Sequence, residues 1–144
     1  MHMLPHHIEV ATDAEGHRSV TTTFDLGPEQ AGAAAHAVRV IRDVRYRTAE
    51  MSADDVLAMR DMTSLADELG ELQALDGRSH VSATVARLGV LRGALEEFAA
   101  GDHLEREGDA AARPFVIALV DAVCDMHADA VHAALTGEPT TVLR

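Results

Sequence analysis

The segment DAVCDMHADAVH, residues 121–132, gathers residue types that bind metal ions. It holds the only cysteine of the 144-residue chain and two of its nine histidines, together with three aspartates. If the segment is helical, each residue turns about 100° around the axis, so His127 and His132 face different sides and cannot share one ion. Cys124 and His127, three residues apart, are neighbours on such a helix and could supply half of a zinc site.

A complete zinc site needs two more ligands, and the best remaining pair is His103 and Glu107. Structural zinc sites are mostly rich in thiolates, and this chain has one thiol. A single Cys or His on an apolar helix face is more often a packing residue than a ligand. We therefore expect Cys124 and His127 to pack against the core, and we predict no metal-binding, cofactor-binding or catalytic residues.

Motifs of several enzyme classes are missing from the sequence. No Glu is followed by His three residues later, as di-iron helical bundles require, and HExxH, GxGxxG and GxSxG do not occur. All 12 basic residues are Arg, so neither a P-loop lysine nor a Schiff-base lysine is available. Asp121 and Asp125 flank Cys124 and should raise the pKa of its thiol, which disfavours a nucleophilic role. We predict that the protein is not an enzyme.

The segment RVIRDVRYR, residues 39–47, is a basic island in a chain of formal net charge −12. One interpretation is a surface that contacts an acidic partner or a phosphate backbone. The other is a solvated face whose arginines pair with acidic neighbours. Asp43, Glu50 and the aspartates of residues 121–129 are candidate partners for such pairs. The second interpretation is favoured, because surface charge runs usually pair locally and the net charge opposes nucleic-acid binding.

A third group of ligand-type side chains lies at the N-terminus, where chains are usually poorly ordered, and is assigned no function: His2, His6 and His7. The same region has neither a positively charged segment nor a long apolar run, so no secretory signal is expected. The longest nearly uninterrupted apolar stretch, residues 115–124, is too short to span a bilayer. The single Cys fits a reducing compartment. We expect a cytoplasmic protein without membrane contact.

The elements that position these residues begin with a β-hairpin. Apolar and polar residues alternate in HIEVAT (7–12) and in SVTTTFDL (19–26), which is the period of a strand. DAEGH (13–17) between them predicts a turn. An isolated hairpin is marginal in water, so the hairpin of residues 7–26 must pack on helices or pair with a second copy.

Apolar residues at three- and four-residue steps, with Ser, Gly and Pro at the ends, predict four helices: residues 28 to about 49, 52–77, 79 or 82 to 101, and 114–136. Residues 101–113 form a polar connector and residues 137–144 a tail. On the last helix the 100° step separates two stripes. The wet stripe comprises Asp121, Asp125, Asp129 and His132. The dry stripe comprises Val116, Val120, Val123, His127, Val131 and Ala134, with Cys124 at its edge.

Consecutive helices with short connections pack antiparallel. The sequence therefore predicts a mainly α fold in a single domain of residues 1–144. An N-terminal β-hairpin (7–26) is followed by an up-down four-helix bundle (28–136). The unpaired hairpin favours a homo-oligomer. We expect a non-enzymatic helical interaction module, homodimeric, that binds another protein and not nucleic acid.

Two alternatives remain open at this point. One is a small-ligand or metal-binding helical bundle that uses Cys124, His127 and His103. The other is a transcription-linked regulatory protein that uses the basic helix of residues 39–47.

Overall fold

The computed structural model describes residues 4–47, 50–101 and 103–142. Eight elements follow one another in this part of the chain: β1 (His6–Thr12), β2 (Arg18–Leu26), α1 (Pro28–Arg45), α2 (Ala53–Gln73), β3 (Ser79–Thr84), α3 (Val85–Ala100), α4 (Asp109–Thr136) and β4 (Thr140–Val142). The expected N-terminal hairpin is confirmed. A mainly α fold holds only loosely, because a four-stranded antiparallel sheet accompanies the helices.

The sheet has the order β3-β2-β1-β4, and both edges of the hairpin are paired. Residues Ser79–Thr84 pair with β2, and residues Thr140–Val142 pair with the first half of β1. The expectation of an unpaired hairpin was therefore wrong. The chain covers its own strand edges, so the main reason for expecting a second copy at the hairpin is removed.

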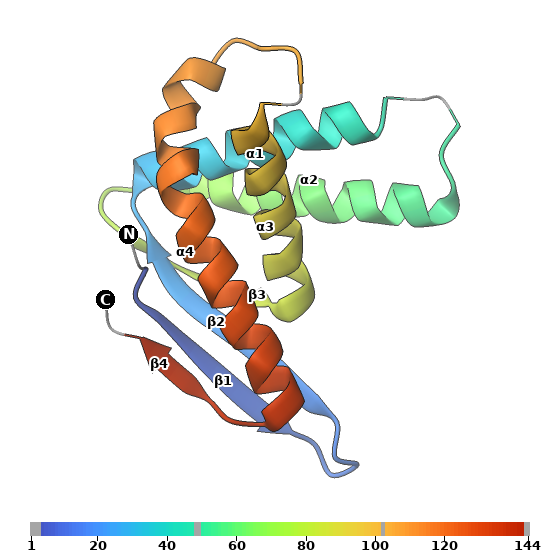
Figure 1. The fold of residues 1–144 in the computed structure, drawn as a ribbon, viewed down its shortest axis with the longest axis vertical. Helices are drawn as coiled ribbons and strands as arrows, with labels where there is room; N and C mark the ends of the chain where they lie inside the picture. The colour runs from blue at the N-terminus through green and yellow to red at the C-terminus, as the bar shows by residue number, and fades with distance from the viewer. Residues whose placement is uncertain (1–3, 48–49, 102, 143–144) are drawn as a thin grey trace.

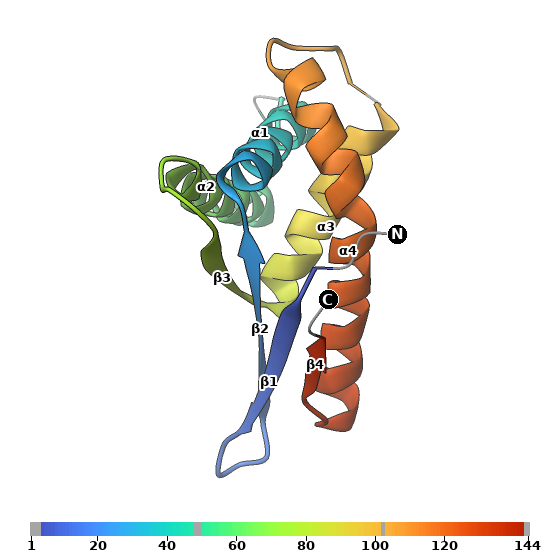
Figure 2. The same cartoon turned by 90° about the vertical axis from the view of Figure 1, so that its left-hand side faces the viewer.

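The helices form two antiparallel pairs that cross, not one up-down bundle. In Figure 1 the α1–α2 pair lies across the α3–α4 pair. Figure 2 shows α4 running along one face of the sheet. The inward residues of β2 pack there and are buried, among them Val20, Phe24 and Leu26, whereas Ser19 and Thr21 of the other face are exposed. α4 therefore buries part of its apolar side against the sheet, where an up-down bundle would place another helix.

Several helix boundaries differ from the sequence expectation. The second helix ends at Gln73, before the expected end at Gly77. The third helix begins at Val85, because the preceding residues alternate in burial and pair with β2. Thr84 caps this helix by accepting a hydrogen bond from the N–H of Arg87. The last helix begins at Asp109, five residues before Pro114, which lies inside it. The first helix ends at Arg45, and its expected end at Ala49 falls outside the described residues.

The core forms one cluster that takes side chains from the sheet and from all four helices. On α4 the buried residues lie on a different side of the helix from the expected dry stripe. Val116 and Val123 are buried as expected, but Val131 is 37% exposed and Met126 is fully buried. No helix in the described part of the chain is both long and apolar enough to cross a membrane.

Candidate functional site

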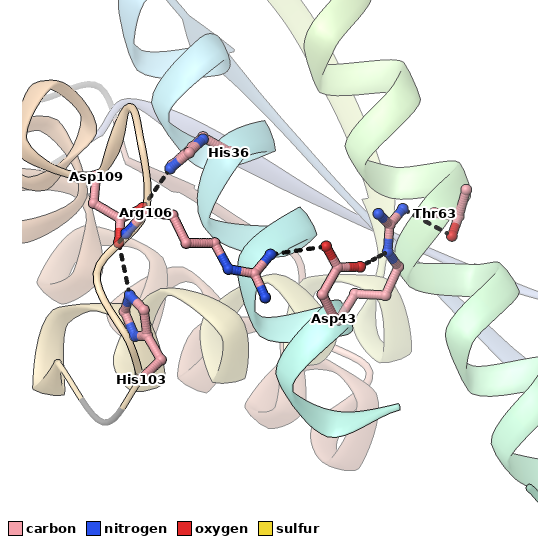
Figure 3. Close-up of polar contacts among 7 residues, drawn as sticks. His36, Asp43, Thr63, His103, Arg106 and Asp109 are labelled. Atoms are coloured by element: carbon pink, nitrogen blue, oxygen red, sulfur yellow. Dashed lines mark hydrogen bonds and ion pairs between the residues drawn. The ribbon is translucent and has the colours of Figure 1, made fainter. Parts of the chain in front are cut away.

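A fully buried carboxylate, Asp109, stands at the start of α4. Its Oδ1 accepts a hydrogen bond from Nε2 of His36 at 2.6 Å, and its Oδ2 accepts one from Nε2 of His103 at 3.0 Å (Figure 3). The backbone N–H of Arg106 donates a third bond to Oδ2 at 2.9 Å. Gly108, at φ +92°, turns the chain so that the aspartate enters the helix with its side chain pointing inward. The site joins α1, the α3–α4 connector and α4.

The protonation state of this group follows from its contacts. Burial raises the pKa of Asp109, but the bonds from the Arg106 N–H and from both imidazoles outweigh it, and the net pKa is lowered. The carboxylate is therefore ionised, and its three hydrogen-bond donors stabilise the buried anion. Nδ1 of His103 is buried without a partner among the described residues. The side chain of His36 is 27% exposed, so this imidazole is the part of the site that reaches solvent.

An aromatic ring holds both imidazoles in place. The ring of His103 stacks on Phe98, with centroids 5.2 Å apart and an interplanar angle of 28°. His36 meets the same ring edge-on, at 5.8 Å and 85°. Phe98 is fully buried. Both histidines are thus fixed by packing as well as by the carboxylate, which is the arrangement of a preorganised polar site.

Arg106 extends the polar contacts from Asp109 across α1 to α2. Its Nη1 donates to Oδ2 of Asp43 at 3.0 Å. The other oxygen of Asp43 accepts from Nε of Arg42 at 3.0 Å, and Nη1 of Arg42 donates to Thr63 at 3.2 Å (Figure 3). Burial raises the pKa of Asp43, but these two arginines outweigh it and lower the pKa. The chain of contacts fixes α1 relative to both of its neighbours.

A cleft of about 350 Å³ opens beside His36, between α1, the end of α2 and the first turns of α4. Polar and apolar side chains line it in about equal measure: Glu29, His36, Arg39 and Gln73 on the polar side, and Ala33, Ala111, Ala112 and Phe115 on the apolar side. Cavities that hold small molecules start at about this volume, and their walls are usually more apolar than these, so this cleft suits a polar ligand.

Glycines make room for three of the four polar side chains of the cleft. A Cβ added at any of them would lie close to a side chain of the cleft. The added Cβ would be 2.5 Å from Cδ of Gln73 at Gly32, 2.7 Å from Nη2 of Arg39 at Gly70, and 3.0 Å from Cε1 of His36 at Gly108. Each polar side chain therefore lies against bare backbone. Any larger residue at these positions would displace a cleft side chain.

Cys124 and His127 lie elsewhere, on the side of α4 that faces α3. Nδ1 of His127 is 3.2 Å from Nη1 of Arg92. Burial and the charge of Arg92 lower the pKa of His127. Burial, with the charges of Glu96 and Asp121, raises the pKa of the Cys124 thiol. The expected direction for Cys124 is confirmed, although burial comes first among its causes.

The structure does not bring the conceivable zinc ligands together. His103 contacts Asp109, and Glu107 is exposed on the connector. Within the described ranges, one group of three ligand-type side chains lies close enough to hold an ion: Asp13, Glu15 and His17. All three are exposed at the hairpin turn, where acidic groups commonly gather without an ion.

Three arginines of the basic island (residues 39–47) lie near acidic side chains of the same chain. Arg42 contacts Asp43, as the second interpretation expected. Arg45 pairs with Glu97 of α3, and Arg39 lies 3.8 Å from Asp67 of α2. The aspartates of α4 were expected as partners, but these contacts go to α2 and α3.

Two of the three N-terminal histidines are held by hydrogen bonds. His6 is buried in β1, where its Nδ1 contacts the carbonyl of Leu4 and its Nε2 contacts Asp129 of α4 at 3.1 Å. His7 is exposed and contacts Thr141 of β4. His2 lies outside the described residues.

Sequence reasoning missed the central residues of this site, Asp109, His36 and Arg106. The one signal was local: Asp109 follows Gly108 and precedes a run of alanines, which is a pattern typical of a helix start. No local pattern links His36 to Asp109, because 73 residues separate them.

Comparison with protein-family models, with curated proteins and with solved structures found no match to this chain.

Proposed function

We propose that the protein is a non-enzymatic binding module whose cleft between α1, α2 and α4 takes a small ligand. One observation carries the proposal: His36 lines the cleft while its Nε2 is held by the fully buried carboxylate of Asp109. The His36 ring therefore links the buried carboxylate to the cleft, since its side chain is 27% exposed. Perturbed buried groups beside a cleft are a general sign of a binding site.

The lining supports binding over catalysis. Among the described residues that line the cleft there is no Ser, Thr, Cys or Tyr to act as a nucleophile. The polar groups that do line it are suited to hold a ligand by hydrogen bonds and charge. This proposal takes up the small-ligand alternative, with His103 as a support of the site and with Cys124 and His127 outside it.

A fragment screen followed by NMR tests the proposal. Small polar molecules should shift the amide signals of residues around His36, Arg39 and Gln73. Gly32→Ala, whose new Cβ would collide with Gln73, should weaken binding. Gly93→Ala in α3 is the matched control, because a Cβ there would meet a neighbour only at 3.6 Å. A screen without cleft-directed shifts, or equal weakening by both variants, would overturn the proposal.

We also propose, as a second candidate, that the chain is an interaction module that forms a homodimer through α4. Large apolar side chains form a stripe on the helix face opposite the core: Ile117 (54% exposed), Val131 (37%) and Leu135 (75%). Ile117 and Val131 lie two seven-residue repeats apart, the repeat by which helices pair with helices of the same pattern. A second copy supplies such a helix.

Sedimentation at high concentration tests the homodimer. The protein should sediment as a dimer, and Ile117→Glu should yield a monomer that keeps its helical content. A strict monomer at high concentration would contradict this candidate. Both candidates keep a cytoplasmic location, supported by the single Cys. They also keep the absence of nucleic-acid binding, which the net charge of −12 supports.

A further inference from the structure

We infer that the ligand of the cleft carries an oxyanion, a carboxylate or a phosphate group, which His36 and Arg39 bind together. The inference rests on the proposed small-ligand function and adds the chemical class of the ligand. It stands on three features of the cleft: the ring of His36 held by Asp109, the free donors of Arg39, and the positions of Gln73 and Glu29.

His36 supplies an oriented donor. Its Nε2 contacts Oδ1 of the buried Asp109 carboxylate at 2.6 Å, and its ring lines the cleft. When the imidazole is protonated, Nδ1–H is the donor that remains for a ligand. The carboxylate behind the ring fixes its orientation, as carboxylates do for histidines in other preorganised sites.

Arg39 supplies a cation, from the next turn of α1. Residues three apart on a helix are neighbours, so both side chains serve the same part of the cleft. Nη2 of Arg39 donates to the carbonyl of Ala66 at 3.2 Å, which anchors the guanidinium. Asp67 is 3.8 Å away, beyond hydrogen-bond distance. Nε and Nη1 have no hydrogen-bond partner in the described part of the chain, and a guanidinium with free donors suits an oxyanion.

Gln73 and Glu29 define what else the ligand carries. The amide of Gln73 can donate to an oxyanion and can accept from a neighbouring group. The carboxylate of Glu29 disfavours a bare anion but accepts from a hydroxyl or an ammonium group. The lining therefore fits a small molecule in which an oxyanion and a hydroxyl or amino group lie a few bonds apart.

NMR titration with simple probes tests the inference. Inorganic phosphate and acetate are added separately at constant ionic strength, with glycerol as a neutral probe. At pH 6 the anions should shift the ring signals of His36 and the amide of Arg39, and glycerol should not. The anion that binds with the higher affinity shows whether the oxyanion of the ligand is a phosphate or a carboxylate.

Charge-matched variants separate a built site from general attraction. Arg39→Gln should weaken anion binding about tenfold or more, because a charged hydrogen bond is lost. Arg60→Gln removes the same charge from the exposed face of α2, outside the cleft, and should leave binding unchanged. Glu29→Gln should strengthen the binding of both anions.

The inference is overturned if Arg60→Gln weakens binding as much as Arg39→Gln, or if glycerol shifts the same signals as the anions. It is also overturned if neutral fragments occupy the cleft while neither anion does, and in that case the proposed small-ligand function stands. His36→Gln should also weaken the binding of both anions, because His36 lines the cleft. If that variant does not fold, the Arg39 and Arg60 pair still decides the matter, because both side chains are partly or fully exposed.

Discussion

Oδ1 of Asp109 lies 2.6 Å from Nε2 of His36, and this contact ties the first turn of α4 to the middle of α1. The carboxylate is completely buried and accepts two further hydrogen bonds. Asp109→Ala should therefore lower the free energy of unfolding by about 3 kcal/mol, because it leaves two imidazoles and a backbone N–H without their acceptor. Urea denaturation followed by circular dichroism measures the change.

Asp129→Ala is the control for Asp109→Ala. Asp129 also accepts from a histidine, His6, but its side chain is 42% exposed. Its removal should cost less than about 1 kcal/mol, since water replaces the lost contact. Equal losses of unfolding free energy in the two variants would show that burial does not determine how much Asp109 contributes to stability.

The stability of the protein should fall steeply in acid, with Asp109 as a main cause. The folded-state pKa of Asp109 is lowered from the ordinary 3.8. Its contribution is therefore fully present above the unfolded-state pKa and is lost as the pH falls through the lower folded value. Asp43, whose pKa is also lowered, adds to the same loss. Unfolding free energies measured from about pH 5 to pH 2 should decline less steeply in Asp109→Asn than in the unmodified protein. Parallel curves would argue against a lowered pKa.

His127 should titrate below the ordinary histidine value of 6.5. Burial is the first cause and the adjacent guanidinium of Arg92 the second. Arg92→Gln should raise the pKa of His127 without restoring it fully, because burial remains. Proton NMR of the His127 Cε1–H signal against pH measures both values. A pKa of His127 that stays the same in Arg92→Gln would exclude a charge effect from this arginine.

Cys124 should react slowly with alkylating reagents. Burial and the charge of Glu96 raise the pKa of its thiol from 9.0, so the reactive thiolate is scarce at neutral pH. Reaction with iodoacetamide at pH 8 should be slower than that of glutathione. Glu96→Gln should accelerate it, whereas Glu97→Gln, a neighbour that contacts Arg45, should not. A Cys124 as fast as glutathione would contradict the raised pKa.

Packing on α4 can be checked with two truncations. Met126 is fully buried and Val131 is 37% exposed. Met126→Ala should lower the unfolding free energy by about 2–5 kcal/mol through lost contacts and a cavity. Val131→Ala should change it by less than about 0.5 kcal/mol. Thermal and urea unfolding of both variants measure these changes. A larger loss of unfolding free energy in Val131→Ala than in Met126→Ala would support the dry stripe expected from the sequence.

Local patterns in the sequence determined much of the secondary structure. Alternation placed both strands of the hairpin, because a half-buried strand must alternate apolar and polar residues. Ser52 and Asp55 mark the start of α2 because each side chain accepts from the backbone N–H of the other. Pro28 marks the start of α1 because it lacks the N–H that would have no partner in the first turn. Each signal depends on residues within one or two turns of each other.

The tertiary structure determined the contacts between distant residues, which local patterns cannot predict. The residues of β3 became a strand because β2 offered an edge, and β4 formed on β1 for the same reason. His36, His103 and Asp109 met only when α1 and α4 packed together, and the packing of α1 on α2 brought Arg39 and Gln73 to the same cleft. The sequence by itself determined which segments form helices and the hairpin, through short-range hydrogen bonding and periodic burial. Which polar groups share a site depends on contacts between residues tens of positions apart, and these arise only from the folded packing of the helices on each other and on the sheet.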